Sequence, residues 1–113
     1  MCLTFVDKKP KKYKKNTGYK VVRKIDGRHC APFFGHYYKP RAWNKDTRKA
    51  KIPGETGNYP AGFHIFHYKK DAIRWELNVW DSVTRKVEYR KVVATGIQFD
   101  RTVIVAREFR FID

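Results

Sequence analysis

The sequence predicts an α+β domain with a small, strongly curved and mostly antiparallel sheet of about five strands and one main helix over residues 70–80. Short apolar or alternating runs recur along the chain between turn residues, and this pattern is typical of strands. Between two of those runs, Ile73, Leu77 and Trp80 repeat with the spacing of a helix that packs one apolar stripe on a sheet.

The length of 113 residues allows one domain with one modest core and no second domain. Residues 1–18 are rich in lysine and predict a basic flexible arm, so residues 19–113 are expected to form the folded domain. The sequence shows neither an apolar run long enough to cross a bilayer nor a secretory signal, which favours the cytoplasm. Cys2 and Cys30 lie far apart and are expected to be free thiols there.

A hairpin is expected near the start of the domain, between a strand over residues 19–25 and a return strand over residues 28–34. Asp26-Gly27 lies between the two strands and suits a two-residue turn, because both residues tolerate positive φ. The first strand alternates as a half-buried strand does, and it sets Lys20 on the face opposite Tyr19.

The stretch from Gly62 to Phe66 organises the rest of the domain, because apolar residues on both of its faces predict a central strand. The glycine at its start allows another backbone to approach closely. Residues 86–94 predict a further strand, with a bulge near Lys91 that reconciles its alternation. Thr95-Gly96 is expected to turn the chain into a last strand over residues 102–112.

The formal net charge of +15 is the strongest departure from an ordinary domain. The arm holds only part of it, since residues 16–113 alone carry 20 lysines and arginines against 10 acids. Such a charge favours phosphate-rich or acidic partners through counterion release and electrostatic steering. The alternative explanation is a surface that charge keeps soluble.

Residues 35–61 predict a long loop in which aromatic and basic side chains alternate. Aromatic faces stack on bases while lysines and arginines hold phosphates, so this mixture suits single-stranded nucleic acid. The alternative is that the aromatic rings fold back and cap the core. The residues expected to contact nucleic acid or an acidic partner are Lys11, Lys12, Lys14, Lys15, Tyr37, Tyr38, Lys39, Arg41, Trp43, Lys45, Arg48, Lys49 and Lys51.

Catalytic and metal-binding sets are not evident in the sequence. His64 and His67 lie three residues apart on a predicted strand, hence on opposite faces, and cannot share a metal ion. We therefore expect no metal and no cofactor, with His64 at most lining a cleft. Glu108 lies in an otherwise apolar strand and is expected to form a salt bridge with an arginine of a neighbouring strand. A binding protein is thus favoured over an enzyme.

The order of several segments resembles a group of small uncharacterised proteins of phages and prophages. The resemblance implies a shared fold and an accessory role in the cytoplasm of a bacterial host. Such a protein would engage nucleic acid or a host complex that handles it, as an inhibitor of a host defence would. The segments are Tyr19-Lys20-Val21-Val22, Gly62-Phe63-His64-Ile65-Phe66, Asp71-Ala72, Lys86-Val87-Glu88 and Val92-Val93-Ala94-Thr95-Gly96.

A second pattern is similar to the core of ADP-ribosyltransferases. It comprises the glycine-led strand from Gly62 to Phe66, a helix with Ala72, and the strand Lys86-Val87-Glu88. This similarity implies a small enzyme that uses NAD, with Glu108 on the late strand where that family often keeps its glutamate. The chain is shorter than those enzymes usually are, and their His-Tyr-Glu or Arg-Ser-Glu sets are not assembled in it. The alternatives to a nucleic-acid-binding protein are therefore this enzyme and a pure protein–protein inhibitor.

Overall fold

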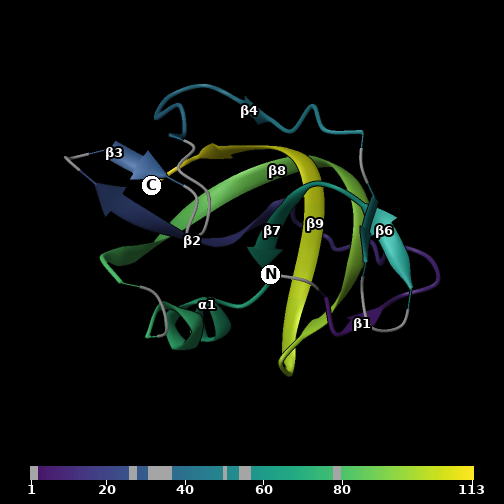
Figure 1. The fold of residues 1–113 in the computed structure, drawn as a ribbon. Helices are drawn as coiled ribbons and strands as arrows, with labels where there is room; N and C mark the ends of the chain where they lie inside the picture. The colour runs from purple at the N-terminus through teal and green to yellow at the C-terminus, as the bar shows by residue number, and fades with distance from the viewer. Residues whose placement is uncertain (1–2, 26–27, 31–36, 50, 54–56, 78–79) are drawn as a thin grey trace.

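The computed structural model describes residues 3–25, 28–30, 37–49, 51–53, 57–77 and 80–113 (Figure 1). Strands dominate the described chain, and one short helix accompanies them. The elements are β1 (Phe5–Val6), β2 (Thr17–Ile25), β3 (Arg28–Cys30), β4 (Asn44–Lys45), β5 (Lys51–Pro53), β6 (Asn58–Pro60), β7 (Phe63–Phe66), α1 (Lys69–Glu76), β8 (Ser82–Gln98) and β9 (Arg101–Phe111).

The protein is mostly β, so the predicted α+β class with about five strands and one main helix is wrong. The main sheet has the strand order β1-β8-β2-β7-β9-β4, and β3 pairs with β2 beside that path. Strands β5 and β6 form a separate two-stranded sheet. The strands that the sequence missed, β4, β5 and β6, have only two or three residues each. Such runs are too short to show alternation.

Strand β8 closes the main sheet on itself. Its first part pairs with β2 and its remainder pairs with β9, all antiparallel. Strand β7 pairs with β9 and, through Phe66 and Tyr19, with β2. The strands β2, β8, β9 and β7 therefore form a small closed barrel, in which side chains on one face of each strand point into a shared core.

The hairpin expected at the start of the domain is confirmed, because Ile25 pairs with Arg28 across it. The turn residues Asp26-Gly27 and the end of the return strand lie outside the described residues. The predicted central strand is also present as β7. At Gly62, just before it, a Cβ atom would lie only 2.8 Å from Val105 Cγ1, so the glycine is needed for the close approach of β9.

Strand β8 is longer than the predicted strand and carries the predicted bulge. Its register against β9 shifts between Val92 and Ala94, and Lys91 has a φ of 60°. The turn expected at Thr95-Gly96 is wrong, since the strand continues through both residues. A Cβ atom at Gly96 would collide with the carbonyl oxygen of Phe5, so this glycine makes room for β1.

The chain turns instead at Phe99 and Asp100, which both have positive φ, at 48° and 64°. The flanking residues Gln98 and Arg101 pair directly, so the turn is a two-residue hairpin connection. Turns of this kind favour glycine or asparagine, and a phenylalanine there gives no signal that sequence reasoning could use.

Helix α1 is shorter than predicted and packs through a different face. The predicted stripe is wrong, because Ile73 is 44% exposed and Leu77 is 85% exposed. Trp80, the third member, is 82% exposed and follows the helix. The helix contacts the sheet instead through buried Ala72 and half-buried Trp75, which belong to the core cluster around Phe66.

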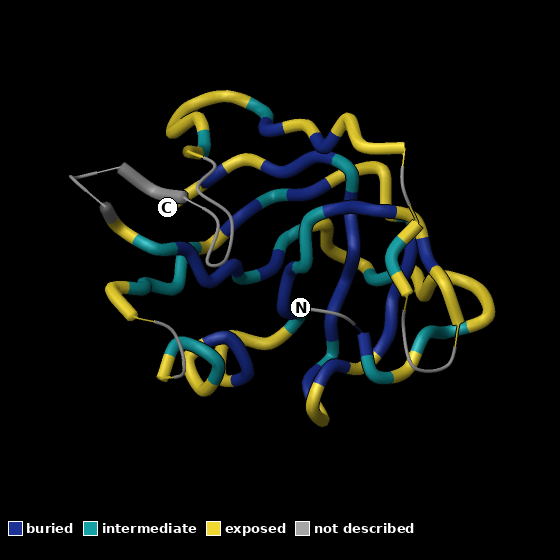
Figure 2. Tube along the Cα trace, viewed as in Figure 1, coloured by how far each residue is buried: buried dark blue, intermediate teal, exposed yellow. Residues whose placement is uncertain are grey.

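The N-terminal segment, predicted as a flexible arm, lies along the barrel. Leu3 is fully buried, and its backbone N–H donates to the hydroxyl of Tyr59. Strand β1 pairs with the end of β8. Figure 2 shows the buried stretches concentrated on the barrel strands, above all on β9, with exposed residues on the connecting segments.

Candidate nucleic-acid interface

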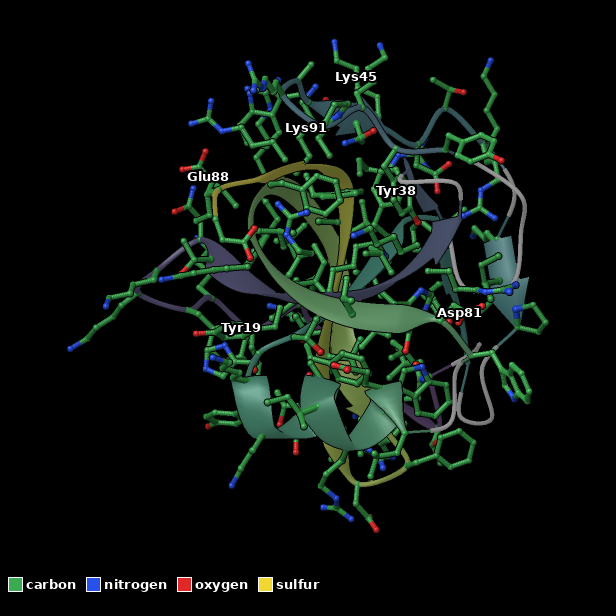
Figure 3. All side chains as sticks on the ribbon, turned by 90° about the vertical axis from the view of Figure 1, so that its left-hand side faces the viewer. Tyr19, Tyr38, Lys45, Asp81, Glu88 and Lys91 are labelled. Atoms are coloured by element: carbon green, nitrogen blue, oxygen red, sulfur yellow. The ribbon has the colours of Figure 1, made fainter. Side chains whose placement is uncertain are left out.

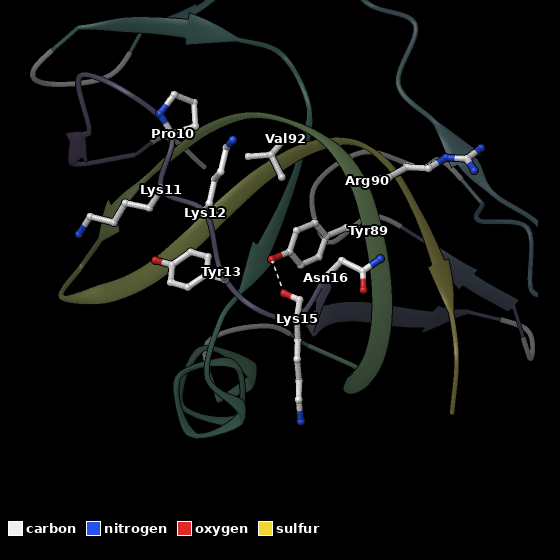
Figure 4. A pocket seen from close by; sticks show the side chains of 9 residues that line it. All are labelled: Pro10, Lys11, Lys12, Tyr13, Lys15, Asn16, Tyr89, Arg90 and Val92. Atoms are coloured by element: carbon white, nitrogen blue, oxygen red, sulfur yellow. Dashed lines mark hydrogen bonds between the residues drawn. The ribbon is translucent and has the colours of Figure 1, made fainter.

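A groove of about 540 Å³ lies between the N-terminal segment and β8 (Figure 4). Four cationic side chains line it, and the two tyrosines Tyr13 and Tyr89 add aromatic surface. The remaining lining residues are uncharged, so no acid among the described residues borders the groove. The cations are Lys11, Lys12, Lys15 and Arg90. The structure thus brings three of the four predicted arm lysines to one place.

Hydrogen bonds hold the backbone of this segment in position. The N–H of Lys11 donates to Thr95 Oγ1 over 2.9 Å, and that hydroxyl donates to Asp7 Oδ2 over 2.6 Å. Further along, the N–H of Tyr89 donates to the carbonyl of Asn16 over 2.8 Å. The groove is therefore a fixed feature of the fold, and its lysine side chains extend from an anchored backbone.

The two tyrosines that line the groove have different environments. The Tyr13 ring stacks on the His67 ring with 4.1 Å between centroids, while Tyr89 is buried and its hydroxyl donates to the Lys15 carbonyl. Burial raises the pKa of both tyrosines, so both hydroxyls stay protonated at neutral pH. The groove thus combines a cationic rim with a neutral aromatic surface.

Arg90 links the groove to a second cluster around Trp43. Its Cζ lies 3.8 Å from the Trp43 ring centroid, and Arg110 Cζ lies 4.9 Å from the same centroid. Glu108 and Glu88 bind these guanidinium groups over 2.6 and 2.7 Å. Trp43, predicted to stack on bases, is therefore already in contact with two arginines.

The salt bridge expected of Glu108 is confirmed. Arg90 and Lys91 each approach one of its oxygens to 2.6 Å. The hydrogen bond from Lys91, followed by that from Arg90, lowers the pKa of this carboxyl, so it is ionised at neutral pH. Because both oxygens are occupied, Glu108 gives no support to the enzymatic role that the ADP-ribosyltransferase resemblance implies.

The predicted loop over residues 35–61 is divided by β4, β5 and β6, and its aromatic and basic residues have different environments. Tyr38 packs edge-on against Phe63 and Phe109 at 6.0 and 5.0 Å, so it caps the core. Arg48 is bound to Asp46 at 2.6 Å, and this contact lowers the pKa of Asp46 against the effect of burial.

Other predicted contact residues are exposed but lie outside the groove. Figure 3 shows Lys45 and Lys91 extending from the same end of the molecule. Tyr37 is also exposed, and Lys14 is exposed beside the groove residues. The remaining exposed members of the predicted set are Lys39, Arg41, Lys49 and Lys51.

Sequence reasoning missed a buried lysine inside the barrel. Lys20 is only 6% exposed, and its Nζ donates to the His64 carbonyl over 3.2 Å. Burial lowers the pKa of Lys20 to about 8, although the negative charge of Asp46 opposes the shift. The alternation of side chains along β2 does not reveal this burial, because both faces of the strand are covered.

His64 lies in the interior and does not line the groove. Its Nε2 is 2.9 Å from the Tyr59 hydroxyl, which accepts a hydrogen bond from the Leu3 N–H. Burial, followed by the charge of Lys20, lowers the pKa of His64 to about 3, so the ring is neutral. The described residues contain no group of three or more side chains suited to a metal ion.

No protein-family model, curated protein or solved structure matches the chain. The resemblances to phage proteins and to ADP-ribosyltransferases therefore remain predictions. Within the described part of the chain, the helix is too short and too polar to cross a membrane. The groove is consequently the feature of the described chain that points to a function.

Proposed function

We propose that this protein binds single-stranded nucleic acid in the groove between the N-terminal segment and β8. The observation that carries the proposal is the set of four cations around one groove without an acid among the described lining residues. Lysines and arginines neutralise phosphates and release counterions, which supplies most of the affinity for nucleic acid. Between the cations, the half-buried ring of Tyr13 offers the bases an apolar contact.

The form of the groove favours a single strand over a duplex. Helical readout of a duplex places an α-helix in the major groove. Helix α1 has 8 residues and does not line this groove, which is built from an extended segment and a strand. Extended surfaces with cationic edges and aromatic floors suit strands whose bases are accessible.

The Trp43 cluster would extend the binding surface without being its main source of affinity. Arg90 and Arg110 are each bound to a glutamate, so a phosphate has to compete with an existing ion pair. The groove lysines have no ion pair among those of the described residues. We therefore assign the larger share of phosphate binding to Lys11, Lys12 and Lys15.

Fluorescence anisotropy with short single-stranded RNA and DNA at increasing salt tests the proposal. Substituting Lys11, Lys12 and Lys15 with serine removes three phosphate contacts. The slope of log affinity against log salt should then become shallower by about 2, because each contact with a single strand contributes about 0.7. Substituting Lys39, Lys49 and Lys51 with serine removes the same charge outside the groove and should change the slope much less.

Two results would count against the groove. Equal losses in the two triple variants would show that net charge alone governs binding. Absence of binding at low salt would remove nucleic acid as the ligand and leave an acidic protein. Pull-down from a bacterial host lysate, with and without nuclease, separates these cases, because a partner kept after nuclease treatment is bound through protein contacts.

A further inference from the structure

Exposed apolar side chains gather at one end of the molecule. Figure 1 places α1, the β8–β9 turn and β1 along the same lower edge, and Figure 3, turned about the vertical axis, keeps α1 and the turn there. Contacts confirm that these elements are neighbours. Phe99 of the turn stacks on Trp75 of α1 at 5.8 Å, its N–H donates to Thr4 Oγ1, and Phe5 pairs with Ile97.

We call this surface the apolar end and define it by six exposed residues. Phe99 is 62% exposed at the turn, and Leu77 and Trp80 extend almost fully into solvent beside α1. A group of large exposed apolar side chains at one end of a protein marks a candidate contact site. The six residues are Phe5, Ile73, Leu77, Trp80, Ile97 and Phe99.

The charged residues around the apolar end are mainly positive on the outside. On α1 the acids turn inward, since Asp71 is buried and Glu76 accepts a hydrogen bond from Thr84 over 2.6 Å. Asp81 and Asp100 are the exposed acids next to Trp80 and Phe99. The exposed bases on or beside the three elements are Lys8, Lys9, Lys69, Lys70 and Arg74.

We propose that the apolar end binds the surface of an anionic lipid bilayer. Tryptophan, phenylalanine, leucine and isoleucine side chains insert at the boundary between headgroups and acyl chains. Lysines and arginines around them are attracted to anionic headgroups. Three elements that present such side chains at one end, with more exposed bases than acids on or beside them, have the chemistry of a peripheral membrane contact.

Charge complementarity selects this occupant over a second copy of the chain. Two copies that each carry a formal charge of +15 repel one another, whereas an anionic bilayer attracts each copy. The contact does not depend on the nucleic-acid groove, which is lined by residues 10–16 and the middle of β8. The two proposals therefore fail or succeed separately.

Co-sedimentation of the full chain with vesicles, in the absence of nucleic acid, tests the proposal. We expect binding to vesicles of phosphatidylcholine with phosphatidylglycerol and much weaker binding to phosphatidylcholine alone. The variant L77S/W80S should lose about tenfold or more in affinity for each substitution, because each removes a large apolar side chain from the contact. Both side chains are exposed, so the circular dichroism spectrum should be unchanged.

The variant with Lys11, Lys12 and Lys15 changed to serine is the control for general electrostatic attraction. It should lose less vesicle affinity than L77S/W80S, although it removes three charges. The proposal is overturned if anionic vesicles do not bind the protein or if L77S/W80S binds them as the parent does. Sedimentation velocity that shows a dimer, abolished in L77S/W80S, would overturn it in favour of self-association.

Discussion

The molecule holds two clusters of cations on aromatic rings, one inside the barrel and one on its surface. Inside, Lys20 Nζ lies 5.4 to 5.6 Å from the ring centroids of Tyr38, Phe63 and Phe109. Outside, Arg90 and Arg110 lie on Trp43. Both clusters use the attraction between a cation and the face of an aromatic ring.

The clusters differ in how the positive charge is compensated. The surface arginines each contact a glutamate, and they remain in contact with water. Lys20 is buried, and its one described hydrogen bond goes to the neutral carbonyl of His64. An aromatic cage therefore does not replace a carboxylate, and the lower pKa of Lys20 reflects that deficit.

The largest expected effect comes from removing the buried charge. The pKa of Lys20 falls from 10.5 to about 8, which corresponds to about 3 kcal/mol of unfavourable free energy for the protonated folded state. Lys20→Met keeps the apolar stem without the charge and should raise the free energy of unfolding at pH 7 by up to about 3 kcal/mol. Urea denaturation measures the change.

The pH dependence gives an independent check on Lys20. Because its folded pKa is lowered, the unfolded chain binds more protons between pH 8 and 10.5, so the parent gains stability as pH rises through this interval. Lys20→Met should remove that gain, while Lys24→Met, on an exposed lysine of the same strand, should keep it. Parallel profiles for the parent and Lys20→Met would show that Lys20 is not the titrating group.

A smaller effect is expected from the surface cluster. Trp43→Leu removes the ring beneath Arg90 and Arg110 and should lower the free energy of unfolding by about 1–2 kcal/mol, at about 0.5–1 kcal/mol for each cation–ring contact. The same measurement on Arg90→Lys separates charge from stacking, since lysine keeps the charge and loses the planar group. If both variants have the same free energy of unfolding as the parent, the contacts of the Trp43 ring do not stabilise the fold.

The two clusters also mark where sequence reasoning succeeds and where it fails. Local patterns located β7, the bulge in β8 and the role of Glu108, because each depends on neighbours along the chain or on one facing strand. They did not show that Lys20 is buried, because alternation separates the two faces of β2 without showing that closure of the barrel covers both. The face of a strand that is buried is decided by the partners that close the sheet.

The same limit explains the helix and the candidate site. The spacing of Ile73 and Leu77 predicts a buried stripe, yet the helix ends at Glu76 and rests on Ala72, so the stripe is exposed. Composition alone singles out the lysines of the N-terminal segment. Their convergence with Arg90 on one groove follows from the anchoring of their backbone on β8, which no local pattern encodes.

The smallest expected change concerns how the free energy of unfolding decreases at acidic pH. Hydrogen bonds from Lys91 and Arg90 lower the pKa of Glu108 in the folded protein. The ionised carboxyl therefore stabilises the folded state at pH values above the pKa that Glu108 has in the unfolded chain. This stabilisation is lost as the pH falls through the pKa that Glu108 has in the folded protein. As the pH falls below about 4.3, the free energy of unfolding of Glu108→Gln should therefore decrease less than that of the parent. Glu88→Gln, which removes the carboxylate from Arg110 only, is the matched variant. A steeper acid limb in Glu108→Gln than in the parent would contradict the assignment, because it would mean that the carboxylate opposes the folded state at low pH.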